Sequence, residues 1–395
     1  MITPRILSNK KPLFHEKIFV TRPNLPSIEE LSPMIEEMLK KRWVTNFGDF
    51  HNEFEEEIKK IIRVKYAVLC CNGTVGLFLL LRALNLQKKV ITTAFTFPAT
   101  VHSAYMAGLE PLFCDIDPED YTLDIQSVEK NITKDTSCIL GVNVFGNICD
   151  VERLDAIGAK FGIPVVYDSA HAFLCAYKNK PVGGFGNAEM FSFHATKLLT
   201  TIEGGAITTN DEDIFIKLKQ LINFGIRNEE SVVGIGLNGK MSEINAIFGL
   251  LSLKKIDTII ANLTELSEIY KKRLSGVPGL KFQKIRSNCK VNNQYMTVEV
   301  IPEKFGLTRD ELHSVLKDDY VIARKYFYPA AHQYECYRGF HFAKSAELPN
   351  TERVANQILC LPIYAGLGVE DVEKICDLIK SIHYHSKDIV HKLRK

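Results

Sequence analysis

The sequence feature that most constrains the fold is an alternation of short apolar runs with longer segments of helical period. This alternation is typical of α/β proteins, in which helices cover a sheet. The apolar runs that we expect to form strands lie at residues 66–71, 90–94, 110–116, 137–144, 165–168, 190–193 and 205–209. The helices that we expect between them lie at residues 75–84, 99–107 and 150–161. The sequence therefore predicts an α/β fold.

The pattern changes in the last third of the chain. A long helical stretch at residues 242–273 is followed by a glycine and a proline that break it. Beyond this break we expect a strand and two helices, at residues 295–300, 309–316 and 370–383. A chain of 395 residues accommodates about two domains. We place a large domain at residues 20–265 and a smaller C-terminal domain at residues 266–395, with segment 1–19 packing near the latter.

Charge and apolar runs exclude several classes of partner. Lys and Arg total 49 against 47 Asp and Glu, a net charge of +2, which predicts neither a nucleic-acid nor an anionic-membrane partner. No run approaches the roughly 20 apolar residues of a membrane span, and the first residues contain no signal-like apolar run. Cys70, Cys114 and Cys138 lie in apolar runs, which indicates buried, reduced thiols. We therefore expect a cytoplasmic protein.

The densest chemical signal is the segment 191–197, which reads Phe-Ser-Phe-His-Ala-Thr-Lys and is followed by Glu203-Gly204-Gly205. A lysine soon after a buried strand is a plausible site for a covalent bond to an aldehyde cofactor. Desolvation removes its proton more readily and makes the amine a nucleophile. Taken alone, Lys197 is also compatible with a surface lysine in a turn.

Two further polar residues follow the apolar run at residues 165–167. Asp168 ends that run and His171 comes three residues later. In open α/β sheets, ligands bind outside the carboxyl ends of the strands, so Asp168 is a candidate partner for a cofactor. An acid beside a pyridine nitrogen keeps that nitrogen protonated. The alternatives are a helix cap for Asp168 and a core position for His171.

Two strand-to-helix turns complete the set of candidates. Asn72-Gly73-Thr74 begins a helix, where free backbone N–H groups suit a phosphate. Phe97 follows the next strand and could stack on a flat ring or belong to the core. Turns of both kinds are common in α/β proteins, so each is a weak signal alone.

Two other motifs are declined. Gly234, Gly236 and Gly239 fit the glycine pattern of dinucleotide sites, but a polar stretch precedes them instead of a strand. His383 and His385 form a possible metal pair without a third ligand in view, so we expect no metal site.

In their order and spacing, these segments resemble the DegT-type nucleotide-sugar aminotransferases, a fold-type I family that uses pyridoxal 5′-phosphate. The resemblance extends from about residue 19 to residue 279, and more faintly through residues 324–329 and 361–364. The motifs that carry it are Trp43-Val-Thr-Asn46, Asn72-Gly-Thr74, Thr96-Phe97, Asp168-x-x-His171, Ser192-Phe-His-Ala-Thr-Lys197 and Glu203-Gly-Gly205. The family's fold has a large domain with a mixed, mostly parallel sheet and a smaller C-terminal α+β domain.

The resemblance implies a role for each candidate residue. Lys197 is implied to be the Schiff-base lysine and Asp168 the partner of the pyridine nitrogen. His171 would contact the cofactor hydroxyl and Phe97 would stack on the ring. The phosphate would be held by the group Gly73, Thr74 and Ser192.

Family members build each site from two subunits. The segment containing Asn238 and Lys240 resembles the one that reaches the neighbour's phosphate site. Lys240 stands where arginine is common, and Gly239 where an aromatic residue is common. The resemblance therefore implies a homodimer with shared active sites.

The implied reaction transfers an amino group from L-glutamate to a 4-keto-6-deoxy-hexose nucleotide, linked to dTDP or UDP. Locally, Phe145-Gly-Asn147 and residues 238–245 look closest to the enzymes that make 4-amino-4,6-dideoxyglucose on dTDP. The alternatives are amination of a 3-keto-sugar nucleotide and a non-enzymatic regulator that binds the cofactor or a sugar nucleotide. A related type that dehydrates sugars carries a histidine in place of the lysine, so Lys197 favours amino transfer.

Overall fold

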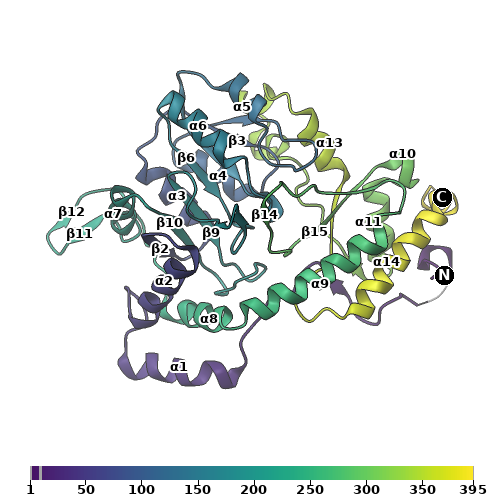
Figure 1. The fold of residues 1–395 in the computed structure, drawn as a ribbon, viewed down its shortest axis with the longest axis horizontal. Helices are drawn as coiled ribbons and strands as arrows, with labels where there is room; N and C mark the ends of the chain where they lie inside the picture. Colours follow the sequence, from purple (N-terminus) through teal and green to yellow (C-terminus); the bar gives the residue numbers. More distant parts are fainter. Residues whose placement is uncertain (1, 9–10, 395) are drawn as a thin grey trace.

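A seven-stranded sheet forms the centre of the larger part of the molecule (Figure 1). The structure is a computed structural model that describes residues 2–8 and 11–394. In sheet order the strands are β2 (Tyr66–Cys70), β10 (Gly205–Thr209), β9 (Ala188–Ser192), β6 (Val165–Asp168), β5 (Thr136–Val142), β3 (Lys89–Thr93) and β4 (Glu110–Cys114). All seven lie within two residues of their predicted ends. Strand β10 is antiparallel to both neighbours and every other pair is parallel, which confirms the mixed, mostly parallel sheet.

Both faces of this sheet are buried under helices. Successive side chains of a strand point to opposite faces. In β2, Ala67 and Leu69 therefore pack in one core cluster, while Val68 and Cys70 pack in another. The second cluster is covered by α3 (Gly73–Ala83), α4 (Pro98–Met106) and α7 (Glu212–Leu221). The first is covered by α2 (Asp49–Ile62), α6 (Val151–Phe161) and α8 (Glu243–Leu253), with α1 (Ile28–Lys41) and α5 (Ile125–Asn131) near its edges.

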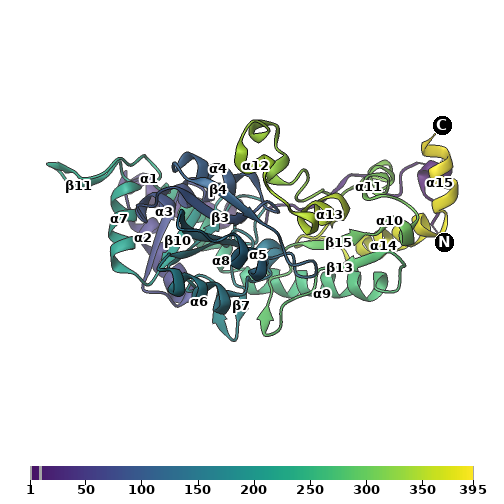
Figure 2. The ribbon, with the colours of Figure 1, turned by 90° about the horizontal axis from the view of Figure 1, so that it is seen from above.

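The prediction of one long helix at residues 242–273 is wrong. The chain forms α8 and a separate helix α9 (Ile256–Leu274), with a turn at Lys254 and Lys255. Neither lysine is a helix breaker, so no local signal marks the turn. The cause is tertiary, because α8 packs against α1 and α2 while α9 packs against a C-terminal helix, α14 (Val369–Tyr384). Figures 1 and 2 show α9 running from the large sheet to the far end of the molecule.

A second, antiparallel sheet lies at that far end. Its strand order is β13 (Leu280–Phe282), β15 (Met296–Val300) and β17 (Ile358–Leu361). The helices around it are α10 (Pro302–Phe305), α11 (Arg309–Asp318), α13 (Pro349–Gln357), α14 and α15 (Ser386–Leu393). Helix α15 was not predicted. Because α9 crosses residue 265 without a break, the domain boundary there stays a prediction.

The N-terminal segment contacts this C-terminal part. Strand β1 (Ile18–Phe19) pairs in parallel with β16 (Val321–Ile322). The backbone N–H groups of Arg5 and Leu13 each donate to the Asp319 carboxylate, at 3.0 Å.

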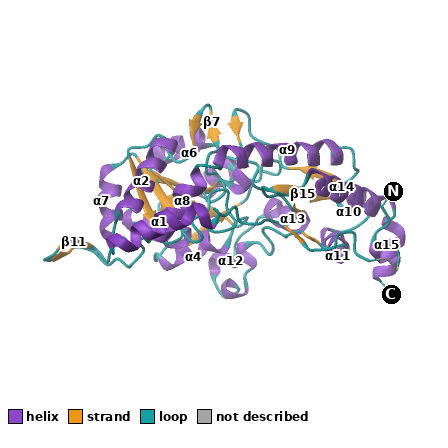
Figure 3. Cartoon of the chain, turned by 90° about the horizontal axis from the view of Figure 1, so that it is seen from below, coloured by secondary structure: helices purple, strands orange, loops and turns teal. Residues whose placement is uncertain are grey.

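The remaining elements are short. Strands β7 (Ala176–Tyr177), β8 (Lys180–Pro181) and β14 (Cys289–Lys290) form a small sheet, and β11 (Ile226–Asn228) and β12 (Ser231–Val232) form a hairpin. The hairpin extends away from the body at one end of the molecule (Figure 3). Within residues 2–8 and 11–394, the remaining elements are helix α12 (His341–Lys344) and four 3₁₀ turns at Arg5–Leu7, Val144–Gly146, Ala331–Gln333 and Glu335–Tyr337. Among the described helices, none is long and apolar enough to cross a bilayer.

Candidate active site

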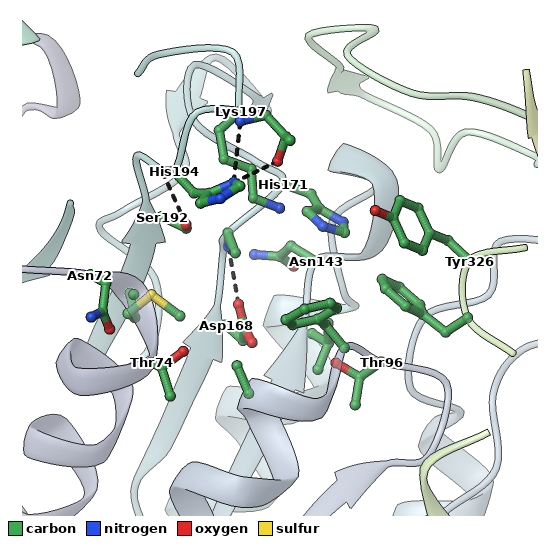
Figure 4. A pocket seen from close by; sticks show the side chains of 18 of the residues that line it. Asn72, Thr74, Thr96, Asn143, Asp168, His171, Ser192, His194, Lys197 and Tyr326 are labelled. Atoms are coloured by element: carbon green, nitrogen blue, oxygen red, sulfur yellow. Dashed lines mark hydrogen bonds between the residues drawn. The ribbon is translucent and has the colours of Figure 1, made fainter. Parts of the chain in front are cut away.

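A cavity of about 620 Å³ opens at the carboxyl ends of the parallel strands. This is where open α/β sheets bind ligands, because the turns after neighbouring strands meet at one edge. Its lining comes mainly from the turns after β2, β3, β5, β6 and β9, and from the C-terminal part of the chain. Seven of the nine predicted site residues line it: Gly73, Thr74, Phe97, Asp168, His171, Ser192 and Lys197. In Figure 4, Asn72, Thr74 and Ser192 lie at one end and Tyr326 at the other.

Asp168 lies buried at the floor of the pocket, at the end of β6. One carboxylate oxygen accepts a hydrogen bond from Thr100 Oγ1 at 2.7 Å, and the other from the Ala170 backbone at 3.1 Å. Burial raises the pKa of Asp168, and these two donors oppose that rise. The side chain is thus held as an oriented acid beneath the cavity.

Lys197 enters the pocket from the loop after β9. Its backbone N–H donates to the His194 carbonyl at 2.8 Å, which closes a turn, and its Nζ donates to the Tyr295 hydroxyl at 3.2 Å. Burial lowers the pKa of Lys197 to about 8, although the Asp168 carboxylate acts in the opposite direction. The neutral, nucleophilic form of the amine is therefore far more populated near neutral pH than in an ordinary lysine.

His171 lies buried in the turn after β6, beside two aromatic rings that also stack on each other. Its ring is parallel to those of Phe145 and Phe327, at centroid distances of 5.9 and 5.8 Å. Burial lowers the pKa of His171 well below its ordinary value. The Phe145 backbone N–H donates to Nδ1 at 3.1 Å, so the proton of the neutral ring belongs on Nε2. His171 can thus offer one N–H to a ligand.

The end of the pocket near α3 is suited to an anion. Helix geometry leaves the amides of Gly73 and Thr74 without acceptors inside α3, while that of Val75 donates to the Asn72 side chain. A Cβ on Gly73 would lie 3.0 Å from both Met190 Sδ and the Ser192 Cβ. Glycine is thus required for the close approach that forms this cradle.

The opposite wall of the pocket was missed by the sequence analysis. It comes from the C-terminal part and consists of Tyr295, Arg324, Tyr326 and Phe327. Only the faint resemblance at residues 324–329 hinted at it. Phe97 faces this wall, with its ring edge toward Phe327 at a centroid distance of 6.3 Å and half of its surface exposed.

Asn143 was also missed, because the predicted strand extended to residue 144 and so included it. In the structure it directly follows β5, and residues in that position line sites in parallel sheets.

Asn238 and Lys240 do not line the pocket of their own chain. Lys240 Nζ donates to Asn223 Oδ1 at 2.7 Å, and its backbone pairs with Cys70. Among the described residues, no group of three or more His, Cys, Asp or Glu side chains is arranged to hold a metal ion.

The chain matches the model of the DegT/DnrJ/EryC1/StrS aminotransferase family over residues 27–380. It belongs to this family. Individual relatives are similar to this chain over nearly its whole length. A dTDP-4-amino-4,6-dideoxy-D-glucose transaminase from Shigella dysenteriae is 37% identical, covering 92% of this chain and 99% of the relative. One from Escherichia coli is 38% identical, covering 91% and 97%.

Solved structures agree with this membership of the DegT/DnrJ/EryC1/StrS family. DesI, in the presence of its TDP-sugar product, superimposes with a TM-score of 0.93 at 35% identity, over 98% of both chains. Helicobacter pylori PseC, an aminotransferase of pseudaminic acid biosynthesis, gives 0.87 at 27% identity, over 93% and 100%. The protein is therefore a pyridoxal-phosphate-dependent sugar aminotransferase of fold-type I.

The pocket fits this cofactor. The absence of a Cβ at Gly73 lets the start of α3, with its free amides, lie close to Ser192. Lys197 supplies an amine of lowered pKa for the aldehyde, and Asp168 supplies a buried acid. The donor set of one amine, one acid and free backbone amides matches an aldehyde, a pyridine nitrogen and a phosphate.

Proposed function

We propose that this chain transfers an amino group from L-glutamate to a 4-keto-6-deoxy-hexose nucleotide, giving a 4-amino-4,6-dideoxy sugar linked to dTDP or UDP. The observation that carries amino transfer is the lysine of lowered pKa in one pocket with a buried acid and an anion cradle. The choice of sugar is supported by the two dTDP-4-amino-4,6-dideoxy-D-glucose transaminases and by DesI with its TDP-sugar.

Lys197 is the proposed covalent anchor and proton carrier. When bound, pyridoxal phosphate supplies an electron-accepting ring that stabilises negative charge on a neighbouring carbon. Lys197 would hold the cofactor through its Nζ. Once the amino donor has taken that place, the free amine would carry a proton from the donor's α-carbon to the cofactor's former aldehyde carbon. A pKa of about 8 suits both steps, since the amine is neither always charged nor always neutral at working pH.

The other residues hold the cofactor in register. Asp168 keeps the ring nitrogen protonated, and its contacts with Thr100 and Ala170 fix its orientation. His171 offers its Nε2–H to the ring hydroxyl, Phe97 packs on the ring, and Gly73, Thr74 and Ser192 hold the phosphate. One regiochemistry should dominate, because a shift of one ring carbon moves the ketone by more than about 1 Å from the amine.

We further propose a homodimer with shared sites, in which Asn238 and Lys240 reach the partner's phosphate end. Their position outside the pocket of their own chain supports this. Mixing Lys197→Ala protein with Lys240→Ala protein should restore activity, because a hybrid dimer contains one site with both lysines. A fully active monomer would refute the shared site.

A cytoplasmic location is also proposed. It is supported by the ten cysteines, all of which are free, since disulfides are rare in the cytosol. Fractionation of the source cells that finds the protein outside the cytosol would overturn this.

The test of the function is incubation of the protein with dTDP-4-keto-6-deoxyglucose and L-glutamate, followed by NMR to locate the new amine. We expect it at carbon 4, and no product from the Lys197→Ala control. An amine at carbon 3 would overturn the regiochemistry. No product with any keto-sugar nucleotide, while the cofactor still binds, would favour a regulator instead.

A further inference from the structure

Glu189 is a buried carboxyl that the proposed mechanism does not use. It lies in the middle of β9 and has no solvent exposure. One oxygen, Oε1, accepts from the backbone N–H groups of Gly183 and Phe185 at 2.6 and 2.8 Å. The other, Oε2, accepts from Ser169 Oγ at 2.5 Å. Both oxygens of the carboxyl thus accept hydrogen bonds, and one of the donors, Ser169, immediately follows Asp168 in the sequence.

From Ser169 the hydrogen bonds continue to the pocket. Ser169 Oγ accepts from Asn143 Nδ2 at 2.9 Å. The Oδ1 atom of the same Asn143 amide accepts from the Cys149 backbone at 2.9 Å. Asn143 lines the cavity, and Figure 4 places it between His171 and Asp168. A chain of three side chains therefore joins the buried carboxyl to the centre of the site.

The charge of Glu189 sets the direction of this chain. An ionised carboxylate only accepts, so the Ser169 hydroxyl must point its proton at Glu189. Ser169 then has only lone pairs left for Asn143. The Cys149 N–H at Oδ1 turns the NH₂ group of Asn143 toward Ser169, and the Ser169 lone pair holds it there. One N–H of that group is used by Ser169, and the second is available to an acceptor in the pocket.

Above neutral pH, Glu189 is mainly in its ionised form. Burial raises the pKa of Glu189 to about 7, while the bonds from Ser169, Phe185 and Gly183 and the charge of Lys180 act to lower it. At pH values well above 7 the carboxylate is therefore charged, and the donor direction described above applies.

We propose that Glu189 is a positioning residue of the aminotransferase site, which acts through Ser169 to aim an Asn143 N–H at the bound cofactor. The inference rests on the proposed cofactor site between Asp168 and His171. It explains why a carboxylate, costly to bury, occupies the interior of a sheet strand next to the catalytic loop.

Three variants separate this role from packing. Glu189→Gln keeps the shape and the bonds from Gly183 and Phe185, but presents an NH₂ group to Ser169 and so leaves the Ser169 hydroxyl proton without its acceptor. Ser169→Ala cuts the chain and leaves both backbone bonds of Glu189 intact. The control is Glu243→Gln, since Glu243 has little solvent exposure and its carboxyl also accepts from two backbone N–H groups, of Phe50 and His51, both at 2.9 Å.

The readouts are the dissociation constant of pyridoxal phosphate, the pH midpoint of the bound cofactor's visible absorbance, and the melting temperature of the cofactor-free proteins. We expect Glu189→Gln and Ser169→Ala each to weaken cofactor binding about tenfold, the effect of one lost hydrogen bond to a charged group. The pH midpoint of the absorbance should move upward, because an ionised oxygen of the cofactor loses a hydrogen-bond donor. The double variant should be no weaker than either single variant.

Glu243→Gln should lower the melting temperature and leave both cofactor readouts unchanged. Wild-type cofactor affinity in Ser169→Ala would overturn the inference, as would additive effects in the double variant. If Glu189→Gln does not fold, Ser169→Ala decides alone. Failure of the proposed function is distinguishable, because a wild-type protein that binds the cofactor without aminating keto sugars still permits the affinity measurements.

Discussion

The two walls of the active-site pocket differ in origin. One wall is built from the turns after β2, β6 and β9, and carries the proposed phosphate cradle, Asp168 and Lys197. The other is built from Tyr295, Arg324, Tyr326 and Phe327, which belong to the C-terminal part of the chain. The first wall contains the groups that match a cofactor. The second contains aromatic rings and a cation, which suit the variable part of a substrate. We therefore expect chemistry to depend on the first wall and substrate affinity on the second.

The largest effect on turnover is expected at Lys197, in the first wall. Lys197→Ala should lower turnover by at least about 10⁴-fold, because the site loses both its nucleophile and its proton carrier. The fold should persist, as measured by circular dichroism and thermal melting. Substantial transamination by this variant would remove the basis for the amino-transfer account.

The second-largest loss of turnover is expected at Asp168. Asp168→Asn keeps a side chain of the same shape, but a neutral amide does not hold the ring nitrogen protonated. We expect cofactor to be retained and kcat to fall about 100-fold or more, as for loss of other electrostatic catalysts. Single-turnover kinetics with L-glutamate check this, and near-normal rates would assign the role to another residue.

The pH dependence of Lys197 tests its burial. With a pKa of about 8, the amine is protonated below that pH and neutral above it. Covalent binding of pyridoxal phosphate by cofactor-free protein should therefore accelerate about tenfold per pH unit below 8 and level off above it. Stopped-flow absorbance measures this rate. A rise that continues toward the pKa of an ordinary lysine would place Lys197 in solvent.

The smallest effect is expected in the second wall, at Tyr326. Tyr326→Ala should raise the KM for the keto-sugar nucleotide by about tenfold, the cost of one aromatic contact. The half-reaction with L-glutamate and the affinity for the cofactor should stay unchanged. If the affinity for the cofactor fell as much as the affinity for the sugar nucleotide, the second wall would serve the cofactor as well as the substrate.

The same division explains what the sequence could predict. Gly73, Asp168 and Ser192 each lie at or next to the end of a strand with a clear apolar pattern, so local signals place them at one edge of the sheet. Tyr326 lies in a turn without a period, and Tyr295 stands at the start of the strand predicted at residues 295–300. The place of both side chains depends on how the second sheet packs against the first.

The turn between α8 and α9 escaped prediction for a similar reason, since packing partners and not a breaker residue set it. Asn143 was missed because the predicted strand extended to residue 144, whereas β5 ends at Val142. The roles of the site residues and the domain boundary at residue 265 stay predictions.

The central claim is that Lys197 holds the cofactor covalently in this pocket. Borohydride reduction of the cofactor-loaded protein fixes the cofactor on the amine that carries it, and peptide mass spectrometry then identifies the residue. We predict a single modified peptide that contains Lys197, and no modification in the Lys197→Ala variant. Stoichiometric modification of another lysine, with Lys197 unmodified, would contradict the account.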